Sequence, residues 1–375
     1  MKKSKLILIL VAVLICIAII PSKVVFADTI PTSAKGMVVI EGNSNQILYG
    51  NNENLELPMA STTKIATCIL AIEKCENLDE KFVVSEKAIG IEGTSIYLKS
   101  GEKLSMRELL YGLMLASGND CAMAIAEYFD GVDNFVNLMN EFASKLELKH
   151  THFANPHGLD EDNHYTSAYD LAIITSYALK NPTFREIVST ERMVIDKTEL
   201  YGVRYLRHKN RLLFTDKNCI GVKTGFTDNA GRCLVNAHEE NGLQIISVVL
   251  NCQPMFEECD RLTKMAMNEY MMKEFVKPYN FVSNIEIDDS EKSEIGVITI
   301  NGFNKPIKKS EEMNYEVKYV MPERLVAPIE LNQGVGKVQV YYNDDIIYEG
   351  ELITIEDAKN NNMKYLFDNI IDKWF

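Results

Sequence analysis

Residues 57–74 read LPMASTTKIATCILAIEK and place Ser61 and Lys64 three positions apart, where a long apolar run begins. The run predicts a buried helix that starts near Ser61. Residues three apart share one face of a helix, so the Lys64 ammonium can reach the Ser61 hydroxyl. A serine is a weak nucleophile until a base takes its proton, and lysine is such a base only when burial or a second cation lowers its pKa well below about 10.4. The stretch therefore predicts either an ordinary helix start with a lysine that reaches solvent, or a nucleophile with its base.

The spacing alone does not decide between the two, because Ser100 and Lys103 show the same spacing in a predicted turn. Two further segments carry matching chemistry. Residues 117–119, Ser-Gly-Asn, present a hydroxyl and an amide at the break between two predicted helices. Residues 223–225, Lys-Thr-Gly, lie on a predicted strand just before a turn. Together the three segments favour a catalytic role for the serine.

The order of the elements indicates the fold class. A hairpin is predicted at 36–50, and a capping box formed by Ser105 and Glu108 opens one of the helices. The other patterns predict helices over 104–117, 119–129, 132–146, 167–180 and 254–276, and strands over 219–227, 231–240 and 243–252. This order is typical of an α+β domain whose first and last strands share one sheet, with helices on both sides. From residue 277 to 355, strand-like segments predict a small all-β domain.

The first 27 residues have a different character. Three lysines precede an apolar run over 6–20, and Val-Phe-Ala follows at 25–27. A basic start, a short apolar region and a small residue at the end predict a secretory signal peptide cleaved after Ala27. The alternative is a retained membrane helix, but the run is shorter than the roughly 20 residues needed to span a bilayer. We therefore expect an exported protein that acts at the outer face of the cytoplasmic membrane or in the cell wall.

Residues 356–375 form the last predicted segment. Apolar residues at helical spacing follow one another at 363, 366, 367, 370, 371 and 374. One interpretation is a helix that lies in the membrane interface, with Trp374 and Phe375 as anchors. The other is a helix that packs against the β domain, since the polar face is not basic. The expected organisation is thus a signal peptide (1–27), a catalytic domain (28–276), an all-β domain (277–355) and a tail helix that serves as a membrane anchor.

Charge and metal-ligand patterns exclude several classes of function. The net charge of −14 becomes −18 when the four lysines of the signal peptide are removed, which argues against nucleic acid as a partner. Seven cysteines remain after cleavage, an odd number without zinc-type spacing, so buried thiols are expected. His150, His152 and His157 could suggest a zinc peptidase, but no H-E-x-x-H motif occurs. We predict neither a metal site nor a cofactor.

The three segments also match a known set in order and separation. Ser61 precedes Ser117 by 56 residues and Ser117 precedes Lys223 by 106, in the order S-x-x-K, S-x-N, K-T-G. The chain resembles the low-molecular-mass penicillin-binding proteins, specifically the serine D-alanyl-D-alanine carboxypeptidases of the type-5 group. The resemblance covers nearly the whole mature chain, including MASTTKIAT, SGNDCAMAIAE, NPHGLDEDNHYTSAYDLA and KTGFTDNAGRCL, the β domain and the tail. It implies a β-lactamase/transpeptidase-like fold for the first domain.

The resemblance implies catalytic roles for Ser61, Lys64 and Ser117, and a substrate-binding role for Asn119. Ser61 would attack the carbonyl of the penultimate D-alanine in a peptidoglycan stem peptide, and neutral Lys64 would take its proton. Ser117 would relay a proton to the departing D-alanine. Asn119 would hold Lys64 and bind a substrate amide. β-Lactam antibiotics would acylate Ser61 as covalent inhibitors.

It also implies substrate-binding roles on the strand. Lys223 and Thr224 would receive the terminal carboxylate, and the Lys223 charge would help to lower the pKa of Lys64. Gly225 would let the substrate backbone run alongside the strand. The N–H groups of Ser61 and Phe226 would form an oxyanion hole. Phe226 departs from the family pattern, in which histidine is frequent here, so we expect a changed substrate preference and pH profile.

Other functions share parts of this pattern. A class A β-lactamase needs a glutamate after its S-D-N motif for fast deacylation, whereas residues 151–158 contain no acid and Gly118 replaces the aspartate. A wall-bound sensor with an inactive site would be expected to have lost a motif residue. A DD-endopeptidase shares every motif, so the sequence leaves that alternative open.

Overall fold

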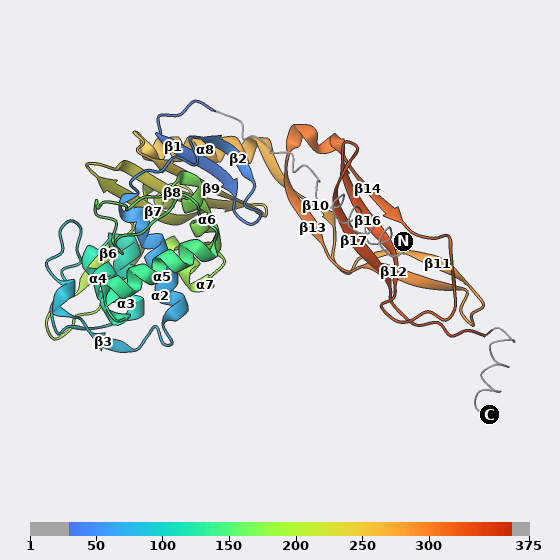
Figure 1. The fold of residues 1–375 in the computed structure, drawn as a ribbon, viewed down its shortest axis with the longest axis horizontal. Helices are drawn as coiled ribbons and strands as arrows, with labels where there is room; N and C mark the ends of the chain where they lie inside the picture. The colour runs from blue at the N-terminus through green and yellow to red at the C-terminus, as the bar shows by residue number, and fades with distance from the viewer. Residues whose placement is uncertain (1–29, 362–375) are drawn as a thin grey trace, which may run out of the picture.

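The computed structural model describes residues 30–361, and Figure 1 shows two parts in sequence order. Helices and a sheet make up the first part, and strands make up nearly all of the second. Within this described range, no helix has both the length and the apolar character needed to cross a membrane. The predicted signal peptide and all of the tail beyond residue 361 lie outside the described residues. The predicted tail helix is wrong for residues 356–361, because Ala358 and Asn360 form isolated bridges with Ile329 and Ser290 instead.

A five-stranded antiparallel sheet supports the first part. Its strands lie in the order β2-β1-β9-β8-β7. Their bounds are β1 Gly36–Glu41, β2 Ile47–Asn51, β7 Cys219–Thr227, β8 Gly231–Glu240 and β9 Leu243–Leu250. β1 pairs with β9, with Val39 opposite Ser247. The prediction that the first and last strands share one sheet is confirmed.

Both faces of this sheet are buried, as the alternation along β1 shows. Val38 and Ile40 pack into the core on the helical side, whereas Met37 and Val39 pack against α8 (Met255–Glu269).

The helices of the first part, in sequence order, are η1 Ala60–Thr63, α2 Lys64–Lys74, η2 Glu86–Ala88, α3 Met106–Tyr111, η3 Gly112–Ala116, α4 Asn119–Tyr128, α5 Val132–Lys145, α6 Ala168–Leu179, α7 Pro182–Ser189, η4 Arg211–Phe214 and α8 Met255–Glu269. Two short hairpins complete this part, β3 Lys81–Val83 with β4 Lys103–Ser105 and β5 Arg192–Ile195 with β6 Arg204–Arg207.

Several local predictions are confirmed and two need correction. Ser105 and Glu108 form the expected capping box at α3. Ser61 does not open an α-helix, because it lies in the 3₁₀ turn η1 and α2 begins at Lys64. The predicted helix over 254–276 ends at Glu269, and residues 270–276 form a strand instead. That strand, β10, pairs with β13 (Phe303–Lys308), and this long-range pairing overrides the local helical pattern.

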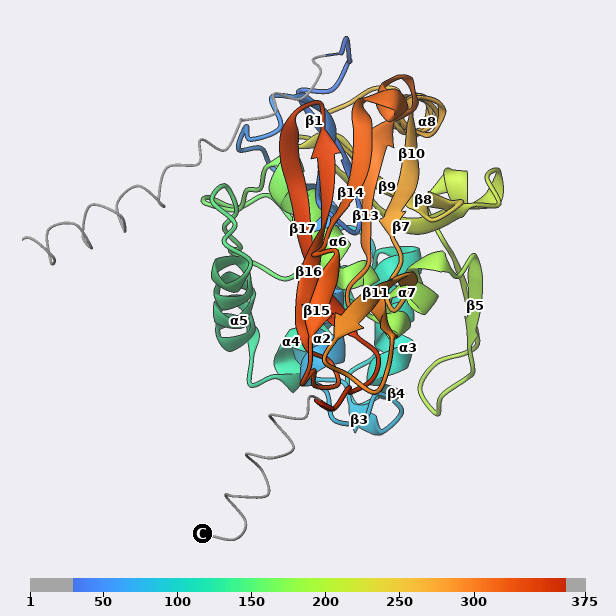
Figure 2. The same ribbon diagram turned by 90° about the vertical axis from the view of Figure 1, so that its right-hand side faces the viewer.

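The second part is all-β, as predicted. Figure 2 looks onto it, with β16 and β17 among the strands nearest the viewer. A six-stranded sheet has the order β14-β16-β17-β12-β11-β15, and β10 pairs with β13 beside it. The bounds are β10 Tyr270–Val276, β11 Phe281–Asp288, β12 Glu294–Thr299, β13 Phe303–Lys308, β14 Tyr315–Val320, β15 Arg324–Val326, β16 Gly334–Tyr342 and β17 Asp345–Thr354. A 3₁₀ turn, η5 Lys309–Asn314, is the helical exception among its described residues.

Candidate active site

Ser61 lies at the point where the chain leaves the hairpin and enters the helical layer. Ala60, directly before it, has φ of 48°, a left-handed conformation that is uncommon for alanine. The hydroxyls of Thr62 and Thr63 donate to the carbonyls of Met59 (2.6 Å) and Ala60 (2.9 Å) and close the turn. The strained turn therefore holds Ser61 at the start of α2, with Lys64 one turn further along.

Lys64 is completely buried and has three polar neighbours. Its Nζ lies 2.9 Å from Ser61 Oγ and 2.7 Å from Asn119 Oδ1, and it also contacts the His157 carbonyl. A neutral amine has two N–H groups and one lone pair. The N–H groups match the two carbonyl oxygens, and the lone pair can accept the Ser61 O–H. The geometry therefore suits a neutral Lys64 that acts on Ser61.

The electrostatics agree with this geometry. The pKa of Lys64 is lowered from 10.5 to about 7, mainly by burial and also by the cation of Lys209, whereas Cys121 and Asp120 act to raise it. Lys223 and Lys64 repel each other, as two neighbouring amines would. Lys209 is a further cation, which the sequence did not predict, and its Nζ lies 3.3 Å from Thr94 Oγ1 on the opposite loop. Lys209 was missed because it lies in no motif and only the fold brings it near Lys64.

Ser117 and Lys223 form a second hydrogen-bonded pair in the site. Ser117 follows the π-helix η3 with φ of 66°, a strained conformation that turns the chain sharply before α4. Lys223 Nζ donates to Ser117 Oγ at 3.0 Å and to the Thr224 carbonyl at 2.9 Å. Lys223 is also completely buried, and burial followed by repulsion from Lys64 and Lys209 lowers its pKa well below the ordinary value. The two predicted lysines are thus both buried, and burial and mutual repulsion disfavour their charged forms.

Asn119 links Lys64 to the loop over residues 92–94. Its Oδ1 accepts from Lys64, its Nδ2 donates to the Glu92 carbonyl at 2.6 Å, and its backbone N–H donates to the Thr94 carbonyl at 2.7 Å. The loop over 92–94 was not predicted to contact the site. No signal in the sequence indicated it, because backbone carbonyls make these contacts.

β7 passes close to the serine turn at Gly225. A Cβ at Gly225 would lie 3.0 Å from the Met59 carbonyl oxygen and 3.2 Å from Ser61 N, so a side chain there would press against the turn. Thr224 precedes it on the strand, and Phe226 follows with 55% of its surface exposed. The structure therefore brings every predicted site residue to one place, where the end of β7 meets η1, α2 and the start of α4.

The histidines of the zinc hypothesis lie apart from one another. His157 contributes its carbonyl to Lys64, and His152 pairs with Tyr165 in an isolated bridge. Burial lowers the pKa of His157 to about 3, which keeps its ring neutral. Within residues 30–361, no three His, Cys, Asp or Glu side chains form a group that could hold a metal ion. The described cysteines are all free thiols, and Cys75 is the least buried of them.

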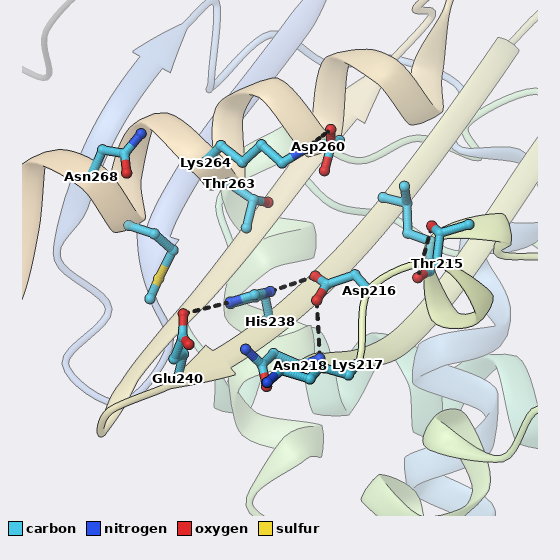
Figure 3. A pocket seen from close by; sticks show the side chains of 12 residues that line it. Thr215, Asp216, Lys217, Asn218, His238, Glu240, Asp260, Thr263, Lys264 and Asn268 are labelled. Atoms are coloured by element: carbon cyan, nitrogen blue, oxygen red, sulfur yellow. Dashed lines mark hydrogen bonds and ion pairs between the residues drawn. The ribbon is translucent and has the colours of Figure 1, made fainter.

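A separate cavity of about 650 Å³ lies between α8 and the far ends of β7 and β8 (Figure 3). His238 Nδ1 and Asp216 Oδ2 lie 2.6 Å apart and share a hydrogen bond. Glu240 Oε2 lies 4.0 Å from His238 Nε2. His238 is opposite Cys219 in the register, whereas Gly225 is opposite Cys233, so the two sites lie at opposite ends of the same strand pair. The cavity has no part in the Ser61 site.

The pKa of Lys64 gives a testable pH dependence. Lys64 accepts a proton only when it is neutral, so the rate constant for acylation of Ser61 is expected to rise about tenfold per pH unit below pH 7 and to level off above it. Acylation by a fluorescent penicillin, followed from about pH 5 to about pH 9, measures this. A flat profile over that range, with the protein still folded by circular dichroism, would contradict a titrating Lys64 base.

Comparison with known proteins agrees with this site. The family described as D-alanyl-D-alanine carboxypeptidase matches residues 23–254, and the family described as penicillin-binding protein 5, C-terminal domain, matches residues 270–360. D-alanyl-D-alanine carboxypeptidase DacF of Bacillus subtilis is 31% identical over 351 residues, covering 91% of this chain and 90% of its own. DacA of Escherichia coli is 30% identical over 363 residues, covering 90% and 86%. Penicillin-binding protein 5 of Haemophilus influenzae superposes with a TM-score of 0.71 at 25% identity, covering 89% of this chain and all of that one.

Fold and site together define a serine peptidase of the type-5 penicillin-binding class, in which a lysine stands beside the serine. The chain belongs to the D-alanyl-D-alanine carboxypeptidase family. The α+β fold class and the serine-hydrolase prediction are confirmed.

Proposed function

We propose that this protein removes the terminal D-alanine from peptidoglycan stem pentapeptides through an acyl-enzyme on Ser61. The observation that carries the proposal is the set of three contacts around the buried Lys64 amine, with the Ser61 hydroxyl as one of them. The family to which the chain belongs supports the reaction type.

The steps follow from the positions of the side chains. Lys64 takes the Ser61 proton as Oγ attacks the carbonyl of the penultimate D-alanine. The C–N bond to the terminal D-alanine then breaks as Ser117 relays to the departing nitrogen the proton that Lys64 took, which leaves Lys64 neutral again. Lys64 next takes a proton from the water that attacks the ester carbonyl, and it returns this proton to Ser61 Oγ as the ester bond breaks.

Substrate binding is assigned to the strand and to Asn119. Lys223 and Thr224 bind the terminal carboxylate, and Lys209 adds positive charge to an otherwise acidic protein. Asn119 has a second N–H on its amide, which can donate to a substrate carbonyl while the first holds Glu92. The N–H groups of Ser61 and Phe226 stabilise the oxyanion, and the close approach at Gly225 keeps these two parts of the site together.

The test is release of D-alanine from a diacyl-L-Lys-D-Ala-D-Ala peptide, with the penicillin adduct mapped by mass spectrometry. The expected result is catalytic release, together with an adduct on the peptide that contains Ser61. An adduct at Ser61 without release of D-alanine would indicate a DD-endopeptidase or a wall-bound sensor instead. An adduct elsewhere would overturn the assignment of Ser61.

Export and organisation are also proposed. The signal peptide over 1–27 would direct the protein to the outer face of the cytoplasmic membrane. The boundary predicted between residues 276 and 277 would lie instead between 269 and 270, because β10 pairs with β13 of the β domain. The family matches to 23–254 and 270–360 support two domains. The intact mass of protein recovered from the cell envelope checks cleavage after Ala27.

We further propose that the tail beyond residue 361 lies in the membrane interface, since Ala358 and Asn360 pair with Ile329 and Ser290 of the β domain. Its apolar stripe ends in Trp374 and Phe375, residues that favour the interface. The full chain is expected to sediment with anionic lipid vesicles, whereas a chain that ends at residue 361, and so keeps the bridges of Ala358 and Asn360, is expected to stay in the supernatant. Equal sedimentation of both proteins would show that the tail is not the membrane anchor.

A further inference from the structure

The loop that covers Asn119 continues into a segment, residues 95–98, that belongs to no strand or helix. Ile96 and Leu98 are 5% and 4% exposed, whereas Tyr97 between them is 67% exposed, with φ of 61°. Buried backbone groups need hydrogen-bond partners, and this segment has no neighbouring strand to supply them. Its partners are two buried charged side chains.

Asp120 holds the N–H side of the segment. Its carboxylate accepts from Ile96 N at 3.1 Å, from Leu98 N at 3.0 Å and from the Ser95 hydroxyl at 2.6 Å. Asp120 is 1% exposed and directly follows Asn119 at the start of α4. The carboxylate therefore ties the segment to the residue next to Asn119.

Arg204 holds the carbonyl side. Its guanidinium donates to the Ile96 carbonyl at 2.8 Å and to the Tyr97 carbonyl at 3.2 Å. The other N–H groups donate to the two Glu102 oxygens at 2.7 Å and 2.8 Å. Arg204 is 5% exposed and Glu102 is 1% exposed, and the Tyr201 ring lies 4.0 Å from the guanidinium carbon. A dry, bidentate ion pair thus fixes the segment against β6.

The same loop sets the orientation of the Asn119 amide. Glu92 and Thr94, a few residues before the segment, accept from the side chain and the backbone of Asn119. A Cβ at Gly93 would lie 2.8 Å from Asn119 Nδ2, so the loop backbone lies directly against the amide. With the loop in place, the amide nitrogen faces Glu92 and Oδ1 faces Lys64. A shift of the loop would release this orientation.

We propose that Arg204, together with Glu102 and Asp120, is a positioning residue for acylation: it fixes the 92–98 loop so that Asn119 presents Oδ1 to Lys64. The inference rests on the proposed function, because it assumes that Lys64 and Asn119 act in acylation of Ser61. Arg204 touches neither Ser61 nor Lys64 in the contacts described, so its effect passes through Asn119. A misplacement of about 1 Å at a catalytic group can cost about 100-fold in rate.

The test compares Arg204→Lys with Arg185→Lys. Arg185 also donates to a glutamate, Glu239, at 2.7 Å in the same domain, but it lies away from the loop and serves as the matched control. Lysine at 204 keeps the charge but loses the forked contacts to the carbonyls of Ile96 and Tyr97. Arg204→Lys is expected to slow acylation by a fluorescent penicillin about 10- to 100-fold, whereas Arg185→Lys is expected to acylate at the wild-type rate. Glu102→Gln, which keeps the shape of the side chain, is a second variant in case Arg204→Lys folds poorly.

A double-mutant cycle separates positioning from general damage to the fold. In an Asn119→Ala background, Arg204→Lys is expected to change the single-turnover acylation rate less than twofold, because the group that it positions is gone. An equal loss in both backgrounds, or a wild-type rate in Arg204→Lys and Glu102→Gln, would overturn the proposal. Wild-type protein that fails to acylate at all would instead overturn the proposed function, so the two failures are distinguishable.

Discussion

The Ser61→Ala protein is expected to release D-alanine at least about 10⁴-fold more slowly than wild type and to form no covalent penicillin adduct. Alanine removes the only atom that can form the acyl bond in the proposed mechanism. The fold is expected to persist, because the turn around Ser61 is closed by the hydroxyls of Thr62 and Thr63 and not by that of Ser61. Release of D-alanine from the peptide and denaturing-gel detection of the adduct measure the two effects.

Ser100→Ala is the matched control for this change. Ser100 and Lys103 repeat the spacing of Ser61 and Lys64, but they lie at a loop and at the start of β4, and both are exposed. Ser100→Ala is expected to keep wild-type activity. Residual D-alanine release by Ser61→Ala above about 1% of wild type would point to another nucleophile, since loss of a nucleophile costs far more than that.

Replacement of Lys64 by methionine has the second largest expected effect. Methionine fills a similar volume but has no amine, so acylation is expected to slow by about 10³-fold, within the range for loss of a general base. Lys103→Met is the corresponding control and is expected to acylate normally. A Lys64→Met protein that acylates at the wild-type rate would exclude Lys64 as the base.

The same variant tests the burial of Lys64 through stability. The folded pKa of about 7 lies below the ordinary 10.5, so between these values the unfolded chain binds more protons than the folded chain. Lys64 thus lowers the stability below pH 7, and this cost is relieved as the pH rises toward the unfolded pKa. Wild type is expected to gain up to about 1.4 kcal/mol per pH unit more than Lys64→Met over this interval. Urea unfolding of both proteins at about pH 7.5 and about pH 9.5 measures the difference, and parallel slopes would argue against a depressed pKa.

Local patterns were sufficient for most helices and for the main sheet. The strands β7, β8 and β9 are long and apolar, and they pair with sequence neighbours. The structure therefore contains the strands that their sequence pattern predicted. Helix α8 is different. Residues 270–276 continue a helical pattern, yet pairing with β13 makes them a strand, and no local signal reports a partner about 30 residues further along the chain.

The motif residues of the site could be named from the sequence, whereas the groups that tune them could not. Ser61, Lys64 and Lys223 stand in recognisable spacings. Lys209 depends on the fold to bring it near Lys64, and the His157 carbonyl is a backbone atom that carries no sequence signal. Arg204 and Glu102 are ordinary charged residues in the sequence, and only their burial shows that they form one ion pair.

The pairing of β1 with β9 has a consequence for how the enzyme matures. Val39 lies opposite Ser247, so the central strand pair closes a loop that contains Ser61, Ser117 and Lys223. Closing so long a loop costs chain entropy before any contact between β1 and β9 can form, so we expect the pairing of β1 with β9 to be a late event in folding. A growing chain therefore carries all its catalytic side chains once residue 226 has been made, yet it cannot hydrolyse anything until β9, which ends at Leu250, has also been made and has paired with β1.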